Sequence, residues 1–348
     1  MNRSTSTWLV ALVLLISVGC GQVQEQATES AVDQPEQDAE LSEVDIAYEE
    51  AADAYEATED PAERVAIAKD FLSRFPDTEK TDNALARAMY PLIEDLEKPD
   101  EAYALFEEYL PQITAPEVKF EARQNLAVLH SMTGNREALS SLAKTMAAEH
   151  DFQYTDHLDL MEAAVEAEAW DLAIQQADAS LALATPEAFK AQYDDISDED
   201  AQRWGRRREA FSAAHKGWAQ ENLGHHEAAL DTFASNAEKT TYSFLGIDDT
   251  PLHIYWGKSL ILQGRFEQAM EKLEVEALYG PKEAKEAFIE AWAALHGSDE
   301  GLEEHFWSLR QKNAKPLPQF TLANYDGDTI DTADFVGDVL LVAAWNPT

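Results

Sequence analysis

The side chains best suited to covalent or metal chemistry are one cysteine, Cys20, and nine histidines. A single thiol excludes an intrachain disulfide and any Cys-x-x-Cys pair. No histidine falls in an H-E-x-x-H or comparable zinc spacing, and solvation in a turn accounts for the adjacent His225 and His226 more readily than a metal does. Carboxylates occur throughout, so no pair stands out. The sequence therefore predicts no catalytic residues, no metal ligands and no cofactor.

The residues around Cys20 predict lipidation of its thiol. An apolar stretch over residues 8–18 is shorter than the roughly 20 residues that cross a bilayer, so it is typical of a secretory signal. With Gly19, the stretch "SVGC" resembles a bacterial lipobox, although Ser17 stands where leucine is most usual. The resemblance implies cleavage before Cys20 and a diacylglyceryl anchor in the cell envelope, with Gly21 favouring the periplasmic face of the outer membrane. The alternative is an ordinary signal peptide with an incidental cysteine.

The chain is strongly acidic. Its 348 residues include 26 basic and 67 acidic ones, which give a formal net charge of −41. Nucleic acids and anionic lipid headgroups are bound through clustered basic residues, so this balance argues against either as a partner. Hydrophobic residues make up 45% of the chain, enough for a sizeable core in two domains of ordinary size.

Four segments are expected from the patterning. Residues 1–20 form the signal peptide, and residues 21–41 form an acidic tether with too few large apolar residues to offset the entropy of ordering. Over residues 42–313, Ala, Leu, Glu and aromatic residues recur every three or four positions and are interrupted by Gly, Pro or Asp, which predicts successive helices. Residues 314–348 contain two prolines near their start, Pro316 and Pro318, which break the helical region, and then show strand patterns. The expected fold class is therefore mainly α with a short, incomplete thioredoxin-like α/β segment at the end.

Two stretches of the helical region, "GWAQENLGHHEAALDTF" and "GKSLILQGRFEQAMEKL", match at an interval of 40 residues. Each has a small residue that lets two helices approach, then a turn glycine, an alanine and a large apolar residue. This order resembles the tetratricopeptide repeat, whose period is about 34 residues, and the excess lies in the loop "TTYSFLGIDDTP". The matched positions are Gly217 and Gly257, Gly224 and Gly264, Ala229 and Ala269, and Phe233 and Leu273.

Weaker echoes elsewhere predict about five to seven helical hairpins, and a non-repetitive helical bundle is the alternative. Stacked hairpins commonly bind extended peptides, so we expect a protein or peptide partner on the array. One dense basic cluster, "RWGRRRE", either pairs with an acidic partner segment or neutralises "YDDISDED" just before it. Its residues are Arg203, Trp204, Arg206, Arg207 and Arg208.

The last segment predicts a β-hairpin and a buried strand. In "QFTLANYDGDTIDTADF", Phe320 and Leu322 alternate with polar residues, an Asp-Gly pair makes a tight turn, and residues 329–330 return. The apolar run over residues 339–344 is typical of a strand that is buried on both faces.

This segment resembles the entry to a thioredoxin-like domain of the TlpA-type thiol–disulfide oxidoreductases, which overlap in sequence with peroxiredoxin-like (AhpC/TSA) proteins. Such domains begin with a Pro-x-Phe-Thr-Leu hairpin and reach a hydrophobic strand that ends in Trp. The matching residues are Pro318, Phe320, Thr321, Leu322, Asp326, Gly327, Phe335, Gly337 and Trp345. The resemblance implies a Cys-x-x-Cys directly after Thr348, at a helix N-terminus that lowers the pKa of the first cysteine.

Because the redox cysteines are not in this sequence, three explanations compete. The sequence is a fragment of a longer protein, or a real stop leaves a vestigial domain, or the tail packs on the last helices without a redox role. The expected function is thiol–disulfide exchange in the parent protein, with the array holding the partner and no activity in the chain as given. A peroxidase is expected instead if the missing loop follows the peroxiredoxin pattern. The rival is a non-enzymatic, membrane-bound scaffold.

Overall fold

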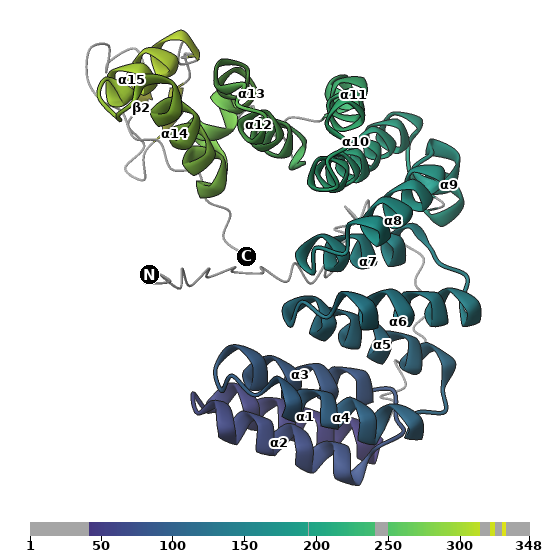
Figure 1. The fold of residues 1–348 in the computed structure, drawn as a ribbon. Coiled ribbons are helices and arrows are strands. Elements are labelled where there is room, and N and C mark those ends of the chain that lie inside the picture. The colour runs from purple at the N-terminus through teal and green to yellow at the C-terminus, as the bar shows by residue number, and fades with distance from the viewer. Residues whose placement is uncertain (1–41, 194, 241–249, 314–320, 324–328, 332–348) are drawn as a thin grey trace, which may run out of the picture. The chain divides into compact units, whose positions relative to one another are not determined.

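The structure, a computed structural model, describes residues 42–193, 195–240, 250–313, 321–323 and 329–331. Over these residues the chain is mainly helical, which confirms the expected mainly-α class. Fifteen α-helices follow one another, and two short strands come after them (Figure 1). The expected signal peptide and tether lie outside the described residues.

The first half of the array holds eight helices and one short 3-10 turn. These are α1 (Glu43–Ala57), α2 (Pro61–Arg74), α3 (Thr81–Glu94), α4 (Pro99–Tyr109), η1 (Leu110–Gln112), α5 (Pro116–Met132), α6 (Arg136–Glu149), α7 (Tyr154–Glu166) and α8 (Trp170–Leu183). The second half holds α9 (Pro186–Gln192), α10 (Asp198–Asn222), α11 (His226–Asn236), η2 (Ala237–Lys239), α12 (Leu252–Leu262), α13 (Phe266–Tyr279), α14 (Lys282–His296) and α15 (Leu302–Asn313).

Several helices begin where the sequence supplies a cap. Asp60 accepts a hydrogen bond from a backbone amide in the first turn of α2, whose first residue is Pro61. Proline is well suited to that position because its missing N–H would have no helical partner there. Asn135, Thr185 and Ser197 cap α6, α9 and α10 in the same way. Local polar residues therefore set these boundaries before any tertiary contact forms.

The turns inside five helix pairs use one residue with positive φ. Glycine fills this place in three of them, with φ of 65° at Gly134, 79° at Gly224 and 71° at Gly264. Glutamate fills it in the α3–α4 and α7–α8 turns, with φ of 53° at Glu97 and 55° at Glu168. The left-handed conformation closes the C-terminus of the first helix and starts the second. The same turn geometry therefore recurs where the sequence shows no glycine.

Consecutive helices pack in pairs, and the pairs stack on one another (Figure 1). The pairs are α1–α2, α3–α4, α5–α6, α7–α8, α10–α11 and α12–α13. The first helix of each pair from α3 onward also packs on the next first helix, which joins α3, α5, α7, α10, α12 and α14 into one series. We call this series the first-helix layer. The short α9 packs on α10 and interrupts the regular alternation of the pairs.

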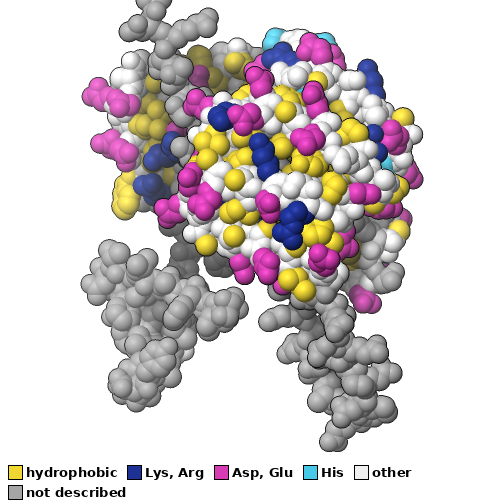
Figure 2. All heavy atoms as spheres, turned by 90° about the horizontal axis from the view of Figure 1, so that it is seen from below, with side chains coloured by type: hydrophobic (Ala, Val, Ile, Leu, Met, Phe, Trp, Pro, Cys, Tyr) yellow, Lys and Arg dark blue, Asp and Glu magenta, His cyan; other side chains and the backbone are white. Residues whose placement is uncertain are grey.

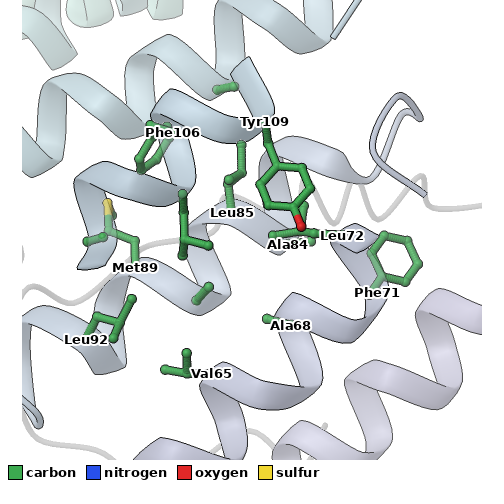
Figure 3. Close-up of a cluster of buried hydrophobic side chains, with 14 of the residues drawn as sticks. Val65, Ala68, Phe71, Leu72, Ala84, Leu85, Met89, Leu92, Phe106 and Tyr109 are labelled. Atoms are coloured by element: carbon green, nitrogen blue, oxygen red, sulfur yellow. The ribbon is translucent and has the colours of Figure 1, made fainter. Parts of the chain in front are cut away.

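Each part of the array is held by apolar side chains from neighbouring helices. Figure 3 shows the cluster of α2, α3 and α4, in which Leu72, Leu85 and Met89 point into the space between the helices. These three side chains and Phe106 are essentially inaccessible to solvent. Removing such apolar surface from water is the main stabilising contribution of each helix pair.

The described part of the tail forms one antiparallel strand pair. Strand β1 (Thr321–Ala323) pairs with β2 (Thr329–Asp331), and Leu322 lies opposite Ile330. The expected Asp-Gly turn and the expected buried strand over residues 339–344 lie outside the described residues. Among the residues that the structure does describe, no helix combines the length and the apolar character needed to cross a bilayer.

Candidate functional site

The predicted repeat residues lie at the contacts inside two helix pairs. A Cβ atom on Gly217 would stand 2.5 Å from the Phe233 ring, and one on Gly257 would stand 2.4 Å from Leu273. Only glycine therefore allows α10 to approach α11, and α12 to approach α13, as closely as they do. The remaining predicted repeat residues are two fully buried alanines and two turn glycines, Ala229, Ala269, Gly224 and Gly264.

The predicted thioredoxin-like motif is described only at β1, which holds Thr321 and Leu322. The other motif residues and the predicted lipidation site lie outside the described residues: Pro318, Phe320, Asp326, Gly327, Phe335, Gly337, Trp345 and Cys20. Across the described residues, no three His, Cys, Asp or Glu side chains are grouped so that they could hold a metal ion. The site with functional potential must therefore be sought on the helices.

Helix α7 carries a row of carboxylates on its side toward α5. Their spacing of three, three and four residues places them on one helical face. Gln124 of α5 donates to the first two members at 3.3 and 3.4 Å, and Ser131 of α5 donates to the last at 2.6 Å. We call this set the α7 acidic row, and its members are Asp156, Asp159, Glu162 and Glu166.

The two central members of the α7 acidic row have raised pKa values. Burial, followed by the charge of Asp156, raises the pKa of Asp159 to about 6. Burial, followed by the charges of Asp159 and Glu166, raises the pKa of Glu162 to about 7. Both side chains reach solvent, yet neighbouring protein atoms displace much of their hydration. Carboxyl groups perturbed in this way are more frequent at functional sites than elsewhere.

Nearby basic side chains are engaged elsewhere. Arg123 of α5 pairs with Glu149, and Lys216 of α10 pairs with Asp178. Within the described residues, no ion pair reaches the two central members of the α7 acidic row. On the face shown in Figure 2, acidic side chains are scattered among apolar ones, so negative charge alone is common on this protein. The row is distinguished by its desolvation and its lack of counter-charge.

An aromatic pair is formed between α10 and α12, the next two helices of the first-helix layer. Trp218 and Tyr255 stack with ring centroids 5.3 Å apart and an interplanar angle of 15°. Burial, and then the charges of Glu283 and Glu162, raise the pKa of the Tyr255 phenol well above its ordinary value. In the described part of the chain, the Tyr255 hydroxyl makes no hydrogen bond. Lys258 of α12, which pairs with Glu283, lies 6.0 Å from the centre of the Trp218 ring, so a cation of the chain itself already faces this pair. Because α7 packs on α10 and α10 packs on α12, the row and the aromatic pair lie on neighbouring helices of the first-helix layer, and we call these parts of the three helices the α7–α12 surface.

His215 supports this surface without neutralising it. The His215 and Tyr255 rings are nearly perpendicular, with their centroids 5.4 Å apart, and His215 Nδ1 lies 2.9 Å from the Phe211 carbonyl oxygen. Burial lowers the pKa of His215 to about 4, so the imidazole is uncharged near neutral pH. Its role at the surface is to pack the aromatic pair.

The basic cluster of α10 divides into different environments. Arg203 pairs with Asp200 at 2.6 Å, in agreement with the neutralising interpretation of this arginine. The Arg208 guanidinium lies 3.5 Å from the centre of the Phe189 ring, where it is half-buried. The other members of the basic cluster are exposed, and neither of the two arginines among them forms an ion pair with another described residue: Trp204, Arg206 and Arg207.

The sequence interpretation missed the α7–α12 surface because carboxylates are so numerous in the chain. The spacing within "YTDHLDLMEAAVE" could have shown that Asp156, Asp159, Glu162 and Glu166 share a face. No local signal could have shown which carboxylates lose hydration, because that loss depends on helices that are distant in sequence.

These features define a mainly helical protein of paired helices, with an acidic and partly desolvated surface on its first-helix layer. No model of a known protein family matches the chain, and no curated protein matches its sequence. Function must therefore be argued from the residues themselves.

Proposed function

We propose that this protein is a lipid-anchored helical-repeat protein of the bacterial cell envelope, and that its first-helix layer holds a partner protein. The observation that carries the proposal is the α7–α12 surface, where four carboxylates share one face of α7 and the stacked rings of Trp218 and Tyr255 lie half-buried on the next two helices of the layer. Aromatic residues are enriched in protein interfaces, and uncompensated charges gain most from a complementary partner.

The proposed repeat class is the tetratricopeptide type. Support comes from the small-to-large contacts of Gly217 with Phe233 and of Gly257 with Leu273, which recur at equivalent places in two successive pairs. The series of first helices, each packed on the next, also agrees with a repeat array. Stacked helical hairpins commonly bind extended peptides, and we assign this role to the first-helix layer.

We also propose that the array serves a thioredoxin-like redox domain of the TlpA type. The motif residues of the tail support this proposal, and the array would hold a disulfide-bearing partner near the redox site. With Cys20 as its single cysteine, the chain as given has no Cys-x-x-Cys and is expected to be inactive in thiol–disulfide exchange. The alternative function is a scaffold that binds proteins on the membrane surface without any redox step.

Site-specific photo-crosslinking tests partner binding. A photoreactive phenylalanine derivative at Asp159 is expected to capture a protein of defined mass in intact cells. The control places the same derivative at Gln175, an exposed residue of α8 outside the first-helix layer. Equal labelling at both positions, or none at either, would contradict a partner site on the α7–α12 surface.

Two measurements test the redox proposal separately. Extended genomic sequence past the Thr348 codon is expected to encode Cys-x-x-Cys within the next few residues, and an immediate stop codon favours the scaffold. Insulin reduction by the chain as given is expected to equal the blank. Turnover above the blank would show that the chemistry does not depend on a Cys-x-x-Cys pair.

A further inference from the structure

We propose that α9 and the N-terminal half of α10 form a contact surface for an acidic segment of a partner protein. We call this surface the α9–α10 patch, and its exposed members are Tyr193, Trp204, Arg206 and Arg207. Trp204 precedes Trp218 on the same helix by about 21 Å along the axis, so the patch is separate from the aromatic pair of the α7–α12 surface. The inference therefore goes beyond the proposed function and does not depend on it.

The first argument is the exposure of two neighbouring aromatic side chains. Tyr193 is 47% exposed and Trp204 is 45% exposed, and both rings lie beside the buried Phe189, with centroid distances of 6.3 and 6.1 Å. The other large hydrophobic side chains that are exposed among the described residues each lie on a different helix. Contact with one shared buried ring thus gathers exposed aromatic surface at this place, and aromatic residues are enriched where proteins bind one another.

The second argument is a pair of arginines without a counter-charge. The acidic start of α10 neutralises a different arginine, since Asp200 pairs with Arg203 at 2.6 Å. Arg206 and Arg207 are exposed, and neither forms an ion pair with another described residue. Arg207 follows Trp204 by three positions, a spacing that makes their side chains neighbours on a helix surface. Positive charge therefore flanks the exposed Trp204 ring.

The third argument is the fixed base of the patch. The half-buried Arg208 guanidinium lies 3.5 Å from the centre of the Phe189 ring and 4.0 Å from the centre of the Tyr154 ring. Guanidinium groups stack on aromatic rings, so Arg208 joins α7, α9 and α10 at this place. A surface that is already ordered loses less conformational entropy when a partner binds.

Together these features select an acidic protein segment. Arginine forms paired, charge-assisted hydrogen bonds with carboxylates, and Trp, Tyr and Arg are enriched among the residues that carry most of the binding energy in protein interfaces. A basic segment would be repelled by Arg206 and Arg207. The net charge of −41 repels acidic peptides at longer range, so affinity for one must come from short-range contacts at a local patch. An anionic membrane meets the same repulsion over a larger area, which favours a peptide.

The test measures peptide binding to the purified protein by fluorescence anisotropy at physiological salt. The probe is fluorescein-labelled Ser-Glu-Leu-Asp-Phe-Glu-Ser with blocked ends, and the matched peptide replaces its acidic residues by glutamine and asparagine. We expect the neutral peptide to bind about tenfold more weakly, because it lacks the charge-assisted contacts. Equal affinities, or no binding of the acidic peptide, would overturn the proposal.

Matched arginine variants locate the binding site. The double variant Arg206→Gln/Arg207→Gln is expected to weaken binding of the acidic peptide about tenfold. The control Arg265→Gln/Arg310→Gln also removes two exposed arginines that form no ion pair with another described residue, and it is expected to change the affinity by less than about twofold. Equal losses in the two double variants would show a general effect of charge and would reject the patch.

A pair of tryptophan variants tests the aromatic contribution. Trp204→Ala is expected to weaken binding about fivefold or more, because tryptophan is among the residues that dominate interface energies. The control Trp307→Ala removes a ring that is 59% exposed on α15, and it is expected to change the affinity by less than about twofold. Circular dichroism establishes that both variants are folded. Equal affinities of the two variants would contradict a role for Trp204.

Two further measurements address other occupants of the patch. Co-sedimentation with phosphatidylglycerol vesicles tests an anionic membrane, and sedimentation equilibrium tests a second copy of this chain. The wild type and Arg206→Gln/Arg207→Gln are expected to behave alike in both. Vesicle binding or self-association that the variant loses would assign the patch to that occupant and would overturn the inference. Crosslinking at Asp159 reports on the α7–α12 surface, so its result tests the proposed function separately.

Discussion

Glu162 shows how a surface carboxyl group can depend on its tertiary surroundings. Neighbouring atoms and the charges of Asp159 and Glu166 raise its pKa to about 7. In the unfolded chain a glutamate releases its proton near pH 4.3, so the folded protein binds this proton more tightly than the unfolded chain does. The stabilising contribution is therefore present at low pH and is lost as the pH rises toward 7.

Because the pKa of Glu162 is raised in the folded protein, the effect of Glu162→Gln on stability is expected to depend on pH. The variant is expected to unfold at a slightly higher temperature than the wild type at pH 8, where the wild-type carboxylate is charged, and to differ little at pH 5; the difference is small because Glu162 is exposed and solvent screens its charge. Thermal unfolding followed by circular dichroism at both pH values measures the difference. Glu137→Gln, at an exposed position of α6, serves as the control. A change in unfolding temperature that is the same at pH 5 and pH 8 would contradict the raised pKa of Glu162.

Glu221 is a second carboxylate, and its role is structural. It is buried near the end of α10, and it accepts hydrogen bonds from Ser259 at 2.6 Å and Gln263 at 2.8 Å, while His226 Nδ1 lies 2.8 Å away. Ser259 and Gln263 belong to the next helix pair. In that pair the matched position is the apolar residue Ile261. Glu221 therefore joins two successive pairs through polar contacts.

Glu221→Ala is expected to destabilise the protein by about 1–3 kcal/mol, because the buried Ser259 hydroxyl loses its acceptor and Gln263 keeps only its weaker contact with Ser259. Chemical denaturation with urea measures this change. Glu227→Ala, at an exposed position of α11, is the matched control and is expected to change stability by less than about 0.5 kcal/mol. A loss as small as that of the control would mean that the network contributes nothing to stability.

At the scale of the element, the close approach of paired helices depends on glycine. Gly217 and Gly205 both lie inside α10, but their surroundings differ. A Cβ on Gly217 would overlap the Phe233 ring, whereas the nearest atom to a Cβ on Gly205 is the Ala184 carbonyl oxygen at 3.5 Å. The same substitution in one helix therefore has opposite expected effects.

Gly217→Ala is expected to destabilise the protein by about 1–3 kcal/mol through overpacking against α11. Gly205→Ala is expected to be neutral or to stabilise by up to about 1 kcal/mol, because alanine has the higher helix propensity. Urea denaturation of the two variants measures the difference. Equal effects would show that helix propensity, and not the α10–α11 contact, decides the outcome.

The positive-φ turns allow the opposite test, in which a substitution stabilises the protein. Glu97 holds a φ of 53° in an exposed turn between α3 and α4, where a side chain is unfavourable. Glu97→Gly is expected to stabilise the protein by about 0.5–1 kcal/mol, and Gly134→Ala, in the equivalent α5–α6 turn, to destabilise it by a similar amount. Thermal unfolding of both variants checks the prediction, and destabilisation by Glu97→Gly would contradict it.

At the scale of the whole molecule, location and net charge set the conditions for binding. A protein with a formal charge of −41 attracts basic partners over the Debye length and repels anionic surfaces. A lipid on Cys20, as proposed, would hold the array at a membrane surface, and the tether predicted over residues 21–41 would separate the two.

A lipid anchor on Cys20 predicts that the protein associates with membranes. Wild-type protein expressed in a bacterial host is expected to fractionate with membranes and to incorporate labelled palmitate, while Cys20→Ser is expected to lose both properties. Detergent phase partitioning and metabolic labelling measure the two outcomes. Membrane association that persists in Cys20→Ser would argue against a lipid on this thiol.

The sequence by itself determined the mainly helical class. Periodicity and glycine spacing are local properties, and they singled out four packing positions, whereas only the structure showed that Gly217 lies against Phe233 and Gly257 against Leu273. The structure alone decided which carboxyl groups have raised pKa values and that Trp218 and Tyr255 stack on one another. These properties depend on atoms from α7, α10 and α12, which are far apart in the chain, and loss of hydration is set by all neighbouring atoms together.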